Sequence, residues 1–132
     1  IGWGMPAAVG VAMAHSGEQP VLNIVSDGGA TFSPHAVWTA ARERLPVVFV
    51  VLVNREYGIL KKYLKALGGH SSRANDTRSV DLIDPPIDYV LQARSYGVDA
   101  HRIASADELT DAVRAALAGG KPMVIEVPMA AV

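Results

Sequence analysis

Hydrophobic residues along the chain fall either in short continuous runs or at helical spacing. Two runs, at 21–26 and 47–53, are rich in β-branched residues and have the length of strands. The second run is almost uninterrupted, which is typical of a parallel strand covered on both faces. A weaker strand is expected over 98–103, and the last strand over 122–127. These four segments predict the strands of one sheet.

Helical patterns separate the predicted strands. The stretch 6–14 is rich in Ala and Gly and predicts a closely packed helix. Ser33 is expected to be the N-cap of a second helix, with Pro34 at its first position. Residues 85–86, both proline, are expected to start a helix that ends near Gly97.

The clearest helix signal follows Ser105. Ser105 and Glu108 form a capping box, and Gly119 is expected to stop the helix. The apolar positions recur with the spacing of one helix face: Leu109, Ala112, Val113, Ala116 and Leu117. The segment 68–79 is polar, lacks any periodicity and is expected to form a mobile surface loop.

Strands that alternate with helices predict parallel pairing through right-handed crossovers. The expected fold class is therefore α/β, a doubly wound, mostly parallel sheet with helices on both faces. A chain of 132 residues suits one domain, so we expect a single domain over 1–132.

Composition excludes several classes of function. Lys and Arg number 12 and Asp and Glu 13, so a formal net charge of −1 gives no electrostatic basis for binding nucleic acid or anionic lipid. The absence of cysteine excludes disulfides, zinc–thiolate sites and thiol catalysis, which fits a reducing cytoplasm. No apolar run has the length of a membrane span, and we expect neither a nucleic-acid nor a membrane partner.

Two polar side chains follow the two strongest strands. Asp27 comes directly after 21–26, and Asn54 comes directly after 47–53. They are 27 residues apart, about one strand-to-strand crossover, and in a parallel sheet both lie at the edge where ligands bind. An amide cannot exchange protons, so this is a poor acid–base pair and a good pair of hard oxygen ligands.

Mg²⁺ characteristically takes a few protein oxygens together with phosphate and water. Gly28 and Gly29, next to Asp27, allow backbone N–H groups to approach phosphate oxygens. The helix near Pro34 adds its positive end if it points at the same crevice. These residues predict a metal-bridged diphosphate site. The alternative is structural, because Asp-Gly-Gly is also an ordinary turn sequence and Asn ends many strands.

The spacing of Ser26-Asp27-Gly28 and Val53-Asn54 resembles the cofactor signature of thiamine diphosphate-dependent enzymes, in which Gly-Asp-Gly leads to Asn-Asn. Essentially the whole chain resembles the C-terminal, diphosphate-binding domain of benzoylformate decarboxylase and its acetolactate-synthase-like relatives. The stretches that carry this likeness are 1–8, 36–41, 54–60 and 122–127.

The resemblance implies thiamine diphosphate and Mg²⁺ as cofactors, with Asp27, the Asn54 side chain and the backbone carbonyl of Glu56 as metal ligands. Leu60 is expected to border the substrate pocket, and Ile1 to support the bent cofactor. The full set of cofactor-binding residues implied is Ile1, Ser26, Gly28, Gly29, Ala30, Tyr57 and Gly58. Two positions depart from the pattern: Ser26 replaces the first glycine and Val53 the first asparagine.

The resemblance also implies a lyase that decarboxylates a 2-keto acid. Its activating glutamate lies on an N-terminal, pyrimidine-binding domain of a partner subunit, in a homodimer or homotetramer. We expect no catalytic residue in this chain, and none of its acidic residues or histidines replaces that glutamate. Arg55, Lys61 and Lys62 are interpreted as a solvated helix face.

Because the sequence opens at Ile1 without a Met, we expect a fragment of a longer three-domain chain, inactive alone. Three alternatives stay open: an acetolactate-synthase-like carboligase domain, the small subunit of a two-chain keto-acid decarboxylase, and a non-catalytic doubly wound ligand-binding module. Dinucleotide binding is disfavoured, because no Gly-x-Gly-x-x-Gly follows a strand and no Walker-type sequence is present.

Overall fold

Four strands form one parallel sheet within residues 1–131, which the computed structural model describes. They are β1 (Val21–Ser26), β2 (Val47–Val53), β3 (Asp99–Arg102) and β4 (Met123–Pro128). Their order across the sheet is β1-β2-β4-β3, and every neighbouring pair is parallel. The predicted strands are therefore all present, and the parallel pairing is confirmed.

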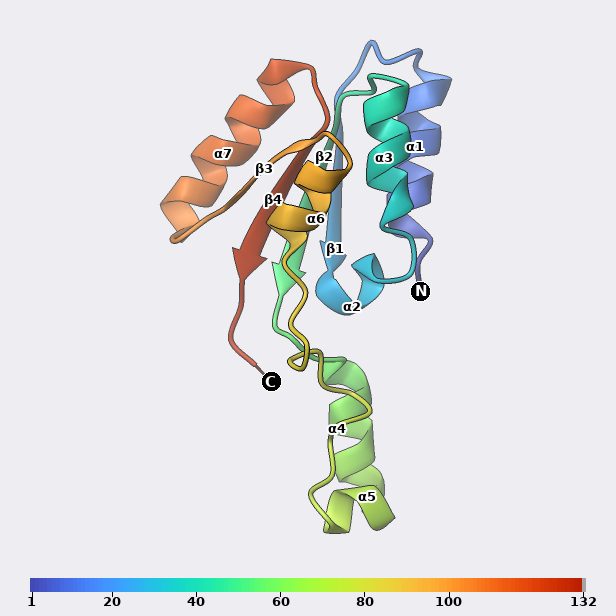
Figure 1. The fold of residues 1–132 in the computed structure, drawn as a ribbon, viewed down its shortest axis with the longest axis vertical. Coiled ribbons are helices and arrows are strands. Elements are labelled where there is room, and N and C mark those ends of the chain that lie inside the picture. The colour runs from blue at the N-terminus through green and yellow to red at the C-terminus, as the bar shows by residue number, and fades with distance from the viewer. Residues whose placement is uncertain (132) are drawn as a thin grey trace.

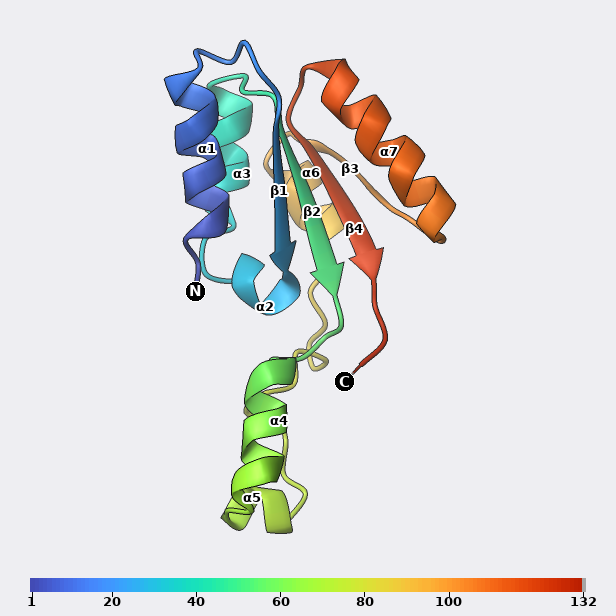
Figure 2. The same ribbon diagram turned by 180° about the vertical axis from the view of Figure 1, so that it is seen from behind.

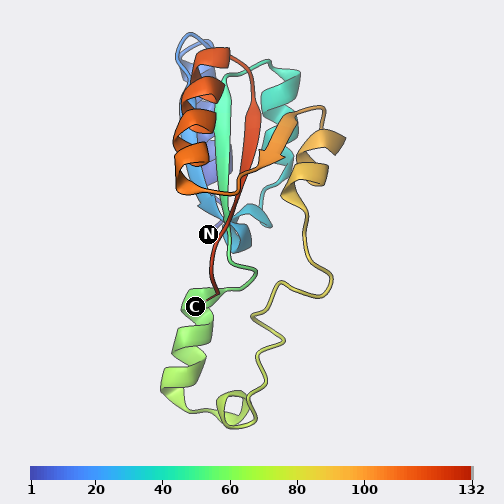
Figure 3. The same ribbon diagram turned by 90° about the vertical axis from the view of Figure 1, so that its left-hand side faces the viewer.

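Helices cover both faces of this sheet, as a doubly wound fold requires. The helices that pack on it or connect its strands are α1 (Gly4–Ala14), α2 (Asp27–Ala30), α3 (His35–Arg42), α6 (Tyr89–Ser95) and α7 (Ala106–Gly119). Figure 3 shows α7 on one side of the strands and α3 and α6 on the other. Side chains of α1, α3 and α6 share one buried cluster, whereas those of α7 belong to a second.

The apolar run of β2 is explained by these two clusters. Val47, Phe49 and Val51 point into the cluster under α1, α3 and α6, and Val48 and Val50 point into the cluster under α7. Successive side chains of a strand alternate between its faces. Because both faces are covered, every residue of the run except the partly buried Leu52 is buried, and the strand contains no polar position.

Helix α7 forms as its sequence predicts. The Ser105 hydroxyl accepts a hydrogen bond from the Glu108 backbone N–H at 3.2 Å, and the Glu108 carboxylate accepts one from the Ala104 N–H at 2.6 Å. The helix ends at Gly120, whose φ of 63° is left-handed. The predicted apolar stripe packs on the second cluster, together with Met123 at the start of β4.

The start of α3 differs from the prediction. Pro34 is the N-cap residue, and no side chain caps this helix. The Ser33 hydroxyl instead donates a hydrogen bond to the Gly2 carbonyl at 2.9 Å. This bond fastens the N-terminal residues to the segment after α2, and a contact 31 residues away gives no local sequence signal.

Two further boundaries are corrected by the structure. The helix expected from the prolines at 85–86 begins only at Tyr89, because the Asp88 side chain caps it by accepting from the Leu91 N–H at 2.8 Å. The segment 68–79 is also not wholly a loop, since α5 (His70–Arg73) forms a single turn of helix within it.

One part of the molecule projects away from the layers. Helix α4 (Gly58–Leu67) and α5 extend beyond the carboxyl ends of the strands (Figures 1 and 2). We call residues 57–82 the arm. Neither of its helices contains a buried residue, and Ile59, Tyr63 and Leu67 on α4 are exposed. Over residues 1–131, no helix combines the length and apolar character needed to cross a membrane.

Candidate diphosphate and metal site

The carboxyl ends of β1 and β2 lie side by side. Ser26, the last residue of β1, is paired with Leu52 of β2, so Asp27 and Asn54 follow neighbouring strands at one edge of the sheet. The expectation that both side chains lie at one edge of the sheet is confirmed, because β1 and β2 are neighbours. Helices α1 and α3 also begin at this edge, and the arm leaves from it (Figure 1).

Asp27 is the most deeply buried acidic side chain of the site, with 1% of its surface exposed. One carboxylate oxygen accepts from the Gly28 N–H at 2.8 Å, and the other accepts from the Arg55 N–H at 2.6 Å. The second bond draws the loop after β2 against the end of β1. Among residues 1–131 no cationic side chain forms an ion pair with Asp27.

A buried carboxylate without a cationic side chain is expected to be balanced by another cation, because buried charges are paired or bind metals. The Asn54 amide oxygen lies in the adjacent loop, where it accepts from the Glu56 N–H at 3.3 Å. The Asp27 carboxylate, the Asn54 amide and the backbone carbonyls of this loop are all hard oxygen donors, the ligand type that Mg²⁺ prefers. The described residues hold no cluster of three or more His, Cys, Asp or Glu that could bind a metal ion.

The glycine after Asp27 is required by close packing. A Cβ on Gly28 would lie 2.7 Å from two ring carbons of Tyr57, at the start of α4. Thr31 strengthens the same contact: its hydroxyl donates to the Gly28 carbonyl at 2.8 Å and lies 3.3 Å from the Tyr57 hydroxyl. Tyr57 and Gly58, where the arm begins, are therefore brought against the turn formed by Gly28, Gly29 and Ala30.

Ser26 acts as the N-cap of the short helix α2. Its hydroxyl accepts from the Gly29 N–H at 3.3 Å. This N–H belongs to the segment that the resemblance places against a diphosphate, so the hydroxyl is a potential competitor for it. Val53, the other departure, is buried in the cluster under α1, α3 and α6, where its methyl groups pack and an amide would need a partner.

Ile1 and Leu60 differ from the rest of the predicted set. Ile1 is 91% exposed, and Leu60 is exposed on α4; neither belongs to a buried cluster. The structure thus brings Asp27, Asn54 and Glu56 together with the glycine turn and the start of the arm, and leaves these two apolar side chains at the surface.

The interpretation of Lys61 as part of a solvated face is wrong. Its side chain is only 19% exposed, and its ammonium donates to Glu56 Oε2 at 2.6 Å and to Asp81 Oδ1 at 2.9 Å. The hydrogen bonds to Glu56 and Asp81 raise the pKa of Lys61, and the bond to Glu56 contributes most. Arg55 and Lys62 are exposed, as predicted.

Sequence reasoning also missed Asp81 and Tyr89. Hydrogen bonds from Thr77 and then from Lys61 lower the pKa of Asp81. The Tyr89 hydroxyl donates to the Asp27 backbone carbonyl at 3.0 Å, and burial, with the nearby Asp27 charge, raises the pKa of this hydroxyl. Tyr89 lies 62 residues from Asp27, so only the fold reveals this contact.

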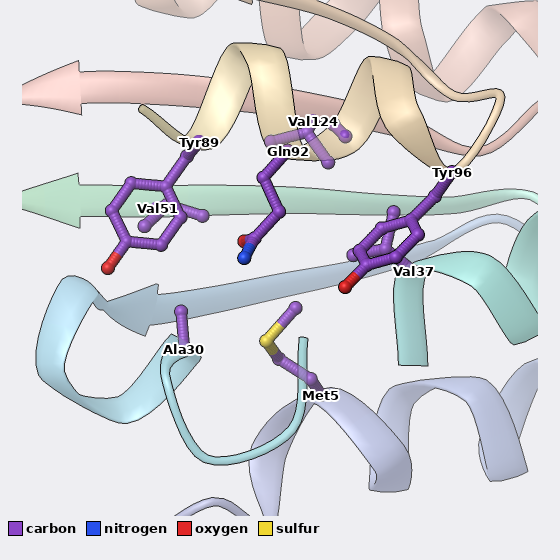
Figure 4. A pocket seen from close by; sticks show the side chains of 9 residues that line it. Met5, Ala30, Val37, Val51, Tyr89, Gln92, Tyr96 and Val124 are labelled. Carbon is purple, nitrogen blue, oxygen red and sulfur yellow. The ribbon is translucent and has the colours of Figure 1, made fainter. Parts of the chain in front are cut away.

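A small cavity lies behind the site, between α6 and the turn of α2. Figure 4 shows the side chains of Tyr89, Gln92 and Tyr96 pointing from α6 toward Met5 and Ala30. Its volume of about 10 Å³ leaves room for at most one water molecule. This cavity is a gap in the packing of the core and is too small for a cofactor.

Comparison with known proteins finds one family over nearly the whole chain. Residues 1–127 match the family described as thiamine pyrophosphate enzyme, C-terminal TPP binding domain. Benzoylformate decarboxylase of Pseudomonas aeruginosa is 39% identical over 128 residues, which are 97% of this chain and 23% of that protein. Acetolactate synthase of Bacillus subtilis is 32% identical over 134 residues, 98% of this chain and 21% of that protein.

Solved structures are similar over the same extent. The thiamine diphosphate-dependent 4-hydroxybenzoylformate decarboxylase of Rhodococcus jostii RHA1 superimposes with a TM-score of 0.86 at 36% identity, covering 100% of this chain and 24% of that one. Benzoylformate decarboxylase of Polynucleobacter necessarius superimposes with a TM-score of 0.85 at 33% identity, covering 98% of this chain and 24% of that one. The chain therefore spans about a quarter of the length of these relatives.

The match over residues 1–127 and the doubly wound architecture lead to one conclusion. This chain belongs to the family of C-terminal, TPP-binding domains of thiamine pyrophosphate enzymes.

Proposed function

We propose that this chain holds Mg²⁺ and the diphosphate of thiamine diphosphate at the carboxyl edge of its sheet, as the cofactor-binding domain of a 2-keto acid decarboxylase of the benzoylformate type. The observation that carries the proposal is the buried Asp27 carboxylate, which is bonded to backbone N–H groups and lies against the loop after β2. A cation at this point would balance its charge.

The residues proposed to hold the metal are Asp27, the Asn54 amide oxygen and the Glu56 backbone carbonyl. Gly28, Gly29 and Ala30 are proposed to lie against the diphosphate, where backbone N–H groups bind phosphate oxygens. Support comes from the donor chemistry, since three hard oxygens leave further positions of an octahedral Mg²⁺ for phosphate and water.

When bound, thiamine diphosphate supplies the carbanion-stabilising chemistry that lets a 2-keto acid lose carbon dioxide. The residues of this chain would orient the cofactor and provide part of its surroundings. Ile1 and Leu60 are proposed to face cofactor and substrate as apolar surfaces, which fits their present exposure. The activating carboxylate is proposed to come from a pyrimidine-binding domain of a partner subunit, in a three-domain protein that forms homodimers or homotetramers.

Sequence identity alone does not separate the two reactions, because a benzoylformate decarboxylase is 39% identical to this chain and a putative acetolactate synthase large subunit of Mycobacterium tuberculosis is 40% identical. Decarboxylation is placed first because the two similar solved structures described above are named as benzoylformate-type decarboxylases. A carboligase is the second candidate, supported by the 32% identity to an acetolactate synthase over 98% of this chain. A decarboxylation assay on the 132-residue chain is expected to give no turnover, and sustained turnover would contradict the proposed need for a partner domain.

The metal site is tested by Asp27→Ala, with Asp111→Ala as a matched control. Asp111 is an exposed aspartate of α7 whose partner is Arg114. Calorimetric titration with thiamine diphosphate in the presence of Mg²⁺ is expected to show tight binding for the wild type and the control, and none for Asp27→Ala. Unchanged affinity in Asp27→Ala would overturn the assignment.

A further inference from the structure

The loop that follows β2 contains a residue in an unfavourable backbone conformation. Arg55 has a φ of 60°, in the left-handed backbone region that residues other than glycine rarely adopt. Its N–H is the group that donates to Asp27 at 2.6 Å, so this conformation aims the loop at the buried carboxylate. Such a conformation persists only when surrounding contacts hold it in place.

Backbone contacts with a distant segment supply part of that restraint. Glu56 and Asp81 form an isolated antiparallel bridge, in which the Tyr57 N–H donates to the Val80 carbonyl at 2.7 Å. On the other side of the bridge, the Leu82 N–H donates to the Arg55 carbonyl at 2.8 Å. The returning end of the arm is therefore tied to both sides of Glu56.

Lys61 joins the two sides of this bridge through its side chain. From the first turn of α4 its ammonium reaches the carboxylates of Glu56 and Asp81, at 2.6 and 2.9 Å. Asp81 is fixed in turn by the Thr77 hydroxyl, which donates to its second oxygen at 2.7 Å. One cation thus lies between two acidic side chains that face each other across the bridge.

Burial strengthens the electrostatic interactions among Lys61, Glu56 and Asp81. The Glu56 side chain is almost fully buried, and those of Lys61 and Asp81 are largely so. Two carboxylates this close repel each other in a region of low dielectric unless a cation separates them, and removing one partner of a buried pair is costly. Loss of the Lys61 charge is therefore expected to push Glu56 and Asp81 apart and to release the loop.

We propose that Lys61 is a positioning residue for the metal site: by holding Glu56 against Asp81 it fixes the loop 54–56, so that Asn54 and the Glu56 carbonyl face Asp27. This role rests on the proposed function. Lys61 also engages the Glu56 carboxylate, which leaves the backbone carbonyl as the donor that this residue offers a metal.

The test uses the complete protein that carries this sequence and compares Lys61→Met with Lys62→Met. Lys62 is the next residue, has the same side chain and is exposed. Titration measures the affinity for Mg²⁺ in the presence of thiamine diphosphate. Hydrogen–deuterium exchange without ligand reports on the loop 54–58 and, as an internal reference, on strand 47–53.

Lys61→Met is expected to weaken Mg²⁺ affinity by about 10–100-fold, the range typical of residues that orient metal ligands. Exchange should accelerate in 54–58 and stay unchanged in 47–53. Lys62→Met should match the wild type, and Lys61→Arg, which keeps the charge, should recover most of the affinity. If exchange in 47–53 also accelerates, the fold has been lost, and Lys61→Gln, which keeps a hydrogen-bond donor, replaces Lys61→Met.

The two proposals fail in different ways. If the wild type binds Mg²⁺ with the cofactor and Lys61→Met binds it equally well, or exchange in 54–58 is unaltered, the positioning role is overturned and the proposed function stands. If the wild type does not bind Mg²⁺ with thiamine diphosphate, the proposed function fails, and the positioning role fails with it.

Discussion

The layered body of the molecule and its projecting arm are stabilised by different forces. In the body, Phe49 of β2 and Ile125 of β4 are fully buried, and helices pack on both faces of the sheet. In the arm, neither α4 nor α5 has a buried residue, and apolar side chains such as Leu67 lie in solvent. Burial of apolar surface stabilises the first region and contributes little to the second.

The candidate site lies where these two regions meet. The body fixes Asp27 at the end of a packed strand, whereas the arm is joined to the body by polar contacts around Glu56, Lys61 and Asp81. Regions with few buried apolar contacts open at low free-energy cost. The candidate site therefore combines a carboxylate that the body holds in place, Asp27, with a loop that polar contacts attach to the arm.

The largest expected difference between the regions is in core packing. Phe49→Ala removes a side chain with 0% exposure and is expected to lower the free energy of unfolding by about 3–5 kcal/mol. Leu67→Ala, at a position 79% exposed, is expected to change it by less than about 0.5 kcal/mol. Urea unfolding of both variants measures the contrast, and similar losses would show that the arm is packed in solution.

The contact between the regions is tested next by Gly28→Ala. The added methyl group would lie 2.7 Å from the Tyr57 ring, so the arm must shift, and a loss of about 1–3 kcal/mol is expected. In a double-mutant cycle, Tyr57→Ala should relieve part of this loss. Gly10→Ala is the control, because nothing lies within 4 Å of its added methyl group and alanine favours a helix. Additive effects of the two substitutions would contradict the contact.

Low pH is expected to reduce the free energy of unfolding through an aspartate of the body more than through one of the arm. The Leu91 N–H, and then Arg102, lower the pKa of Asp88, which caps α6. Because this pKa is lower in the folded state, the unfolded state binds more protons. The Asp88 carboxylate therefore contributes fully to the free energy of unfolding at pH values above its unfolded pKa of about 4. This contribution is lost as the pH falls through its folded pKa. Asp88→Asn keeps the cap and should flatten the fall of unfolding free energy below about pH 4.

An aspartate of the arm provides the comparison for that experiment. A hydrogen bond from Arg78 lowers the pKa of Asp76 to about 2, but both residues lie on the arm, away from the buried clusters. Asp76→Asn should leave the fall in the free energy of global unfolding below about pH 4 close to that of the wild type. A larger effect from Asp76 than from Asp88 would show that the arm unfolds together with the body.

The smallest expected effect concerns Ser26. Ser26→Gly releases the Gly29 N–H from a long, 3.3 Å hydrogen bond and costs the cap only a few tenths of a kcal/mol. If that N–H binds the diphosphate, affinity for Mg²⁺–thiamine diphosphate should rise by about twofold, the low end for one hydrogen bond. Ser105→Gly, which changes the N-cap of α7 in the same way, is the control and should leave the calorimetric affinity for Mg²⁺–thiamine diphosphate unchanged. Weaker binding by Ser26→Gly would mean that the hydroxyl supports the cofactor.

Features encoded within a few residues could be predicted from the sequence. The run of β2 and the capping box and stripe of α7 depend on neighbours in the chain, and both match the structure. The spacing of 27 residues matched one crossover, and the structure shows that β1 and β2 are neighbours. These features place Asp27 and Asn54 at a shared edge without any knowledge of coordinates.

Features that depend on distant contacts could not be predicted. Ser33 bonds to Gly2 rather than capping α3, and Lys61 is paired because the fold returns Asp81 to the start of the arm. The Tyr89 hydroxyl reaches Asp27 across 62 residues. A lysine or serine near a helix start has the same local pattern whether it is solvated or bonded, so the sequence alone favoured the commoner state.

The most direct test of the account locates the cation itself. Crystals of the complete protein grown with thiamine diphosphate and Mn²⁺ in place of Mg²⁺ would reveal the ion by its anomalous scattering. We predict one ion about 2 Å from a carboxylate oxygen of Asp27 and from the Asn54 amide oxygen. A bound cofactor whose ion lies elsewhere, with neither of these oxygens in contact, would contradict it.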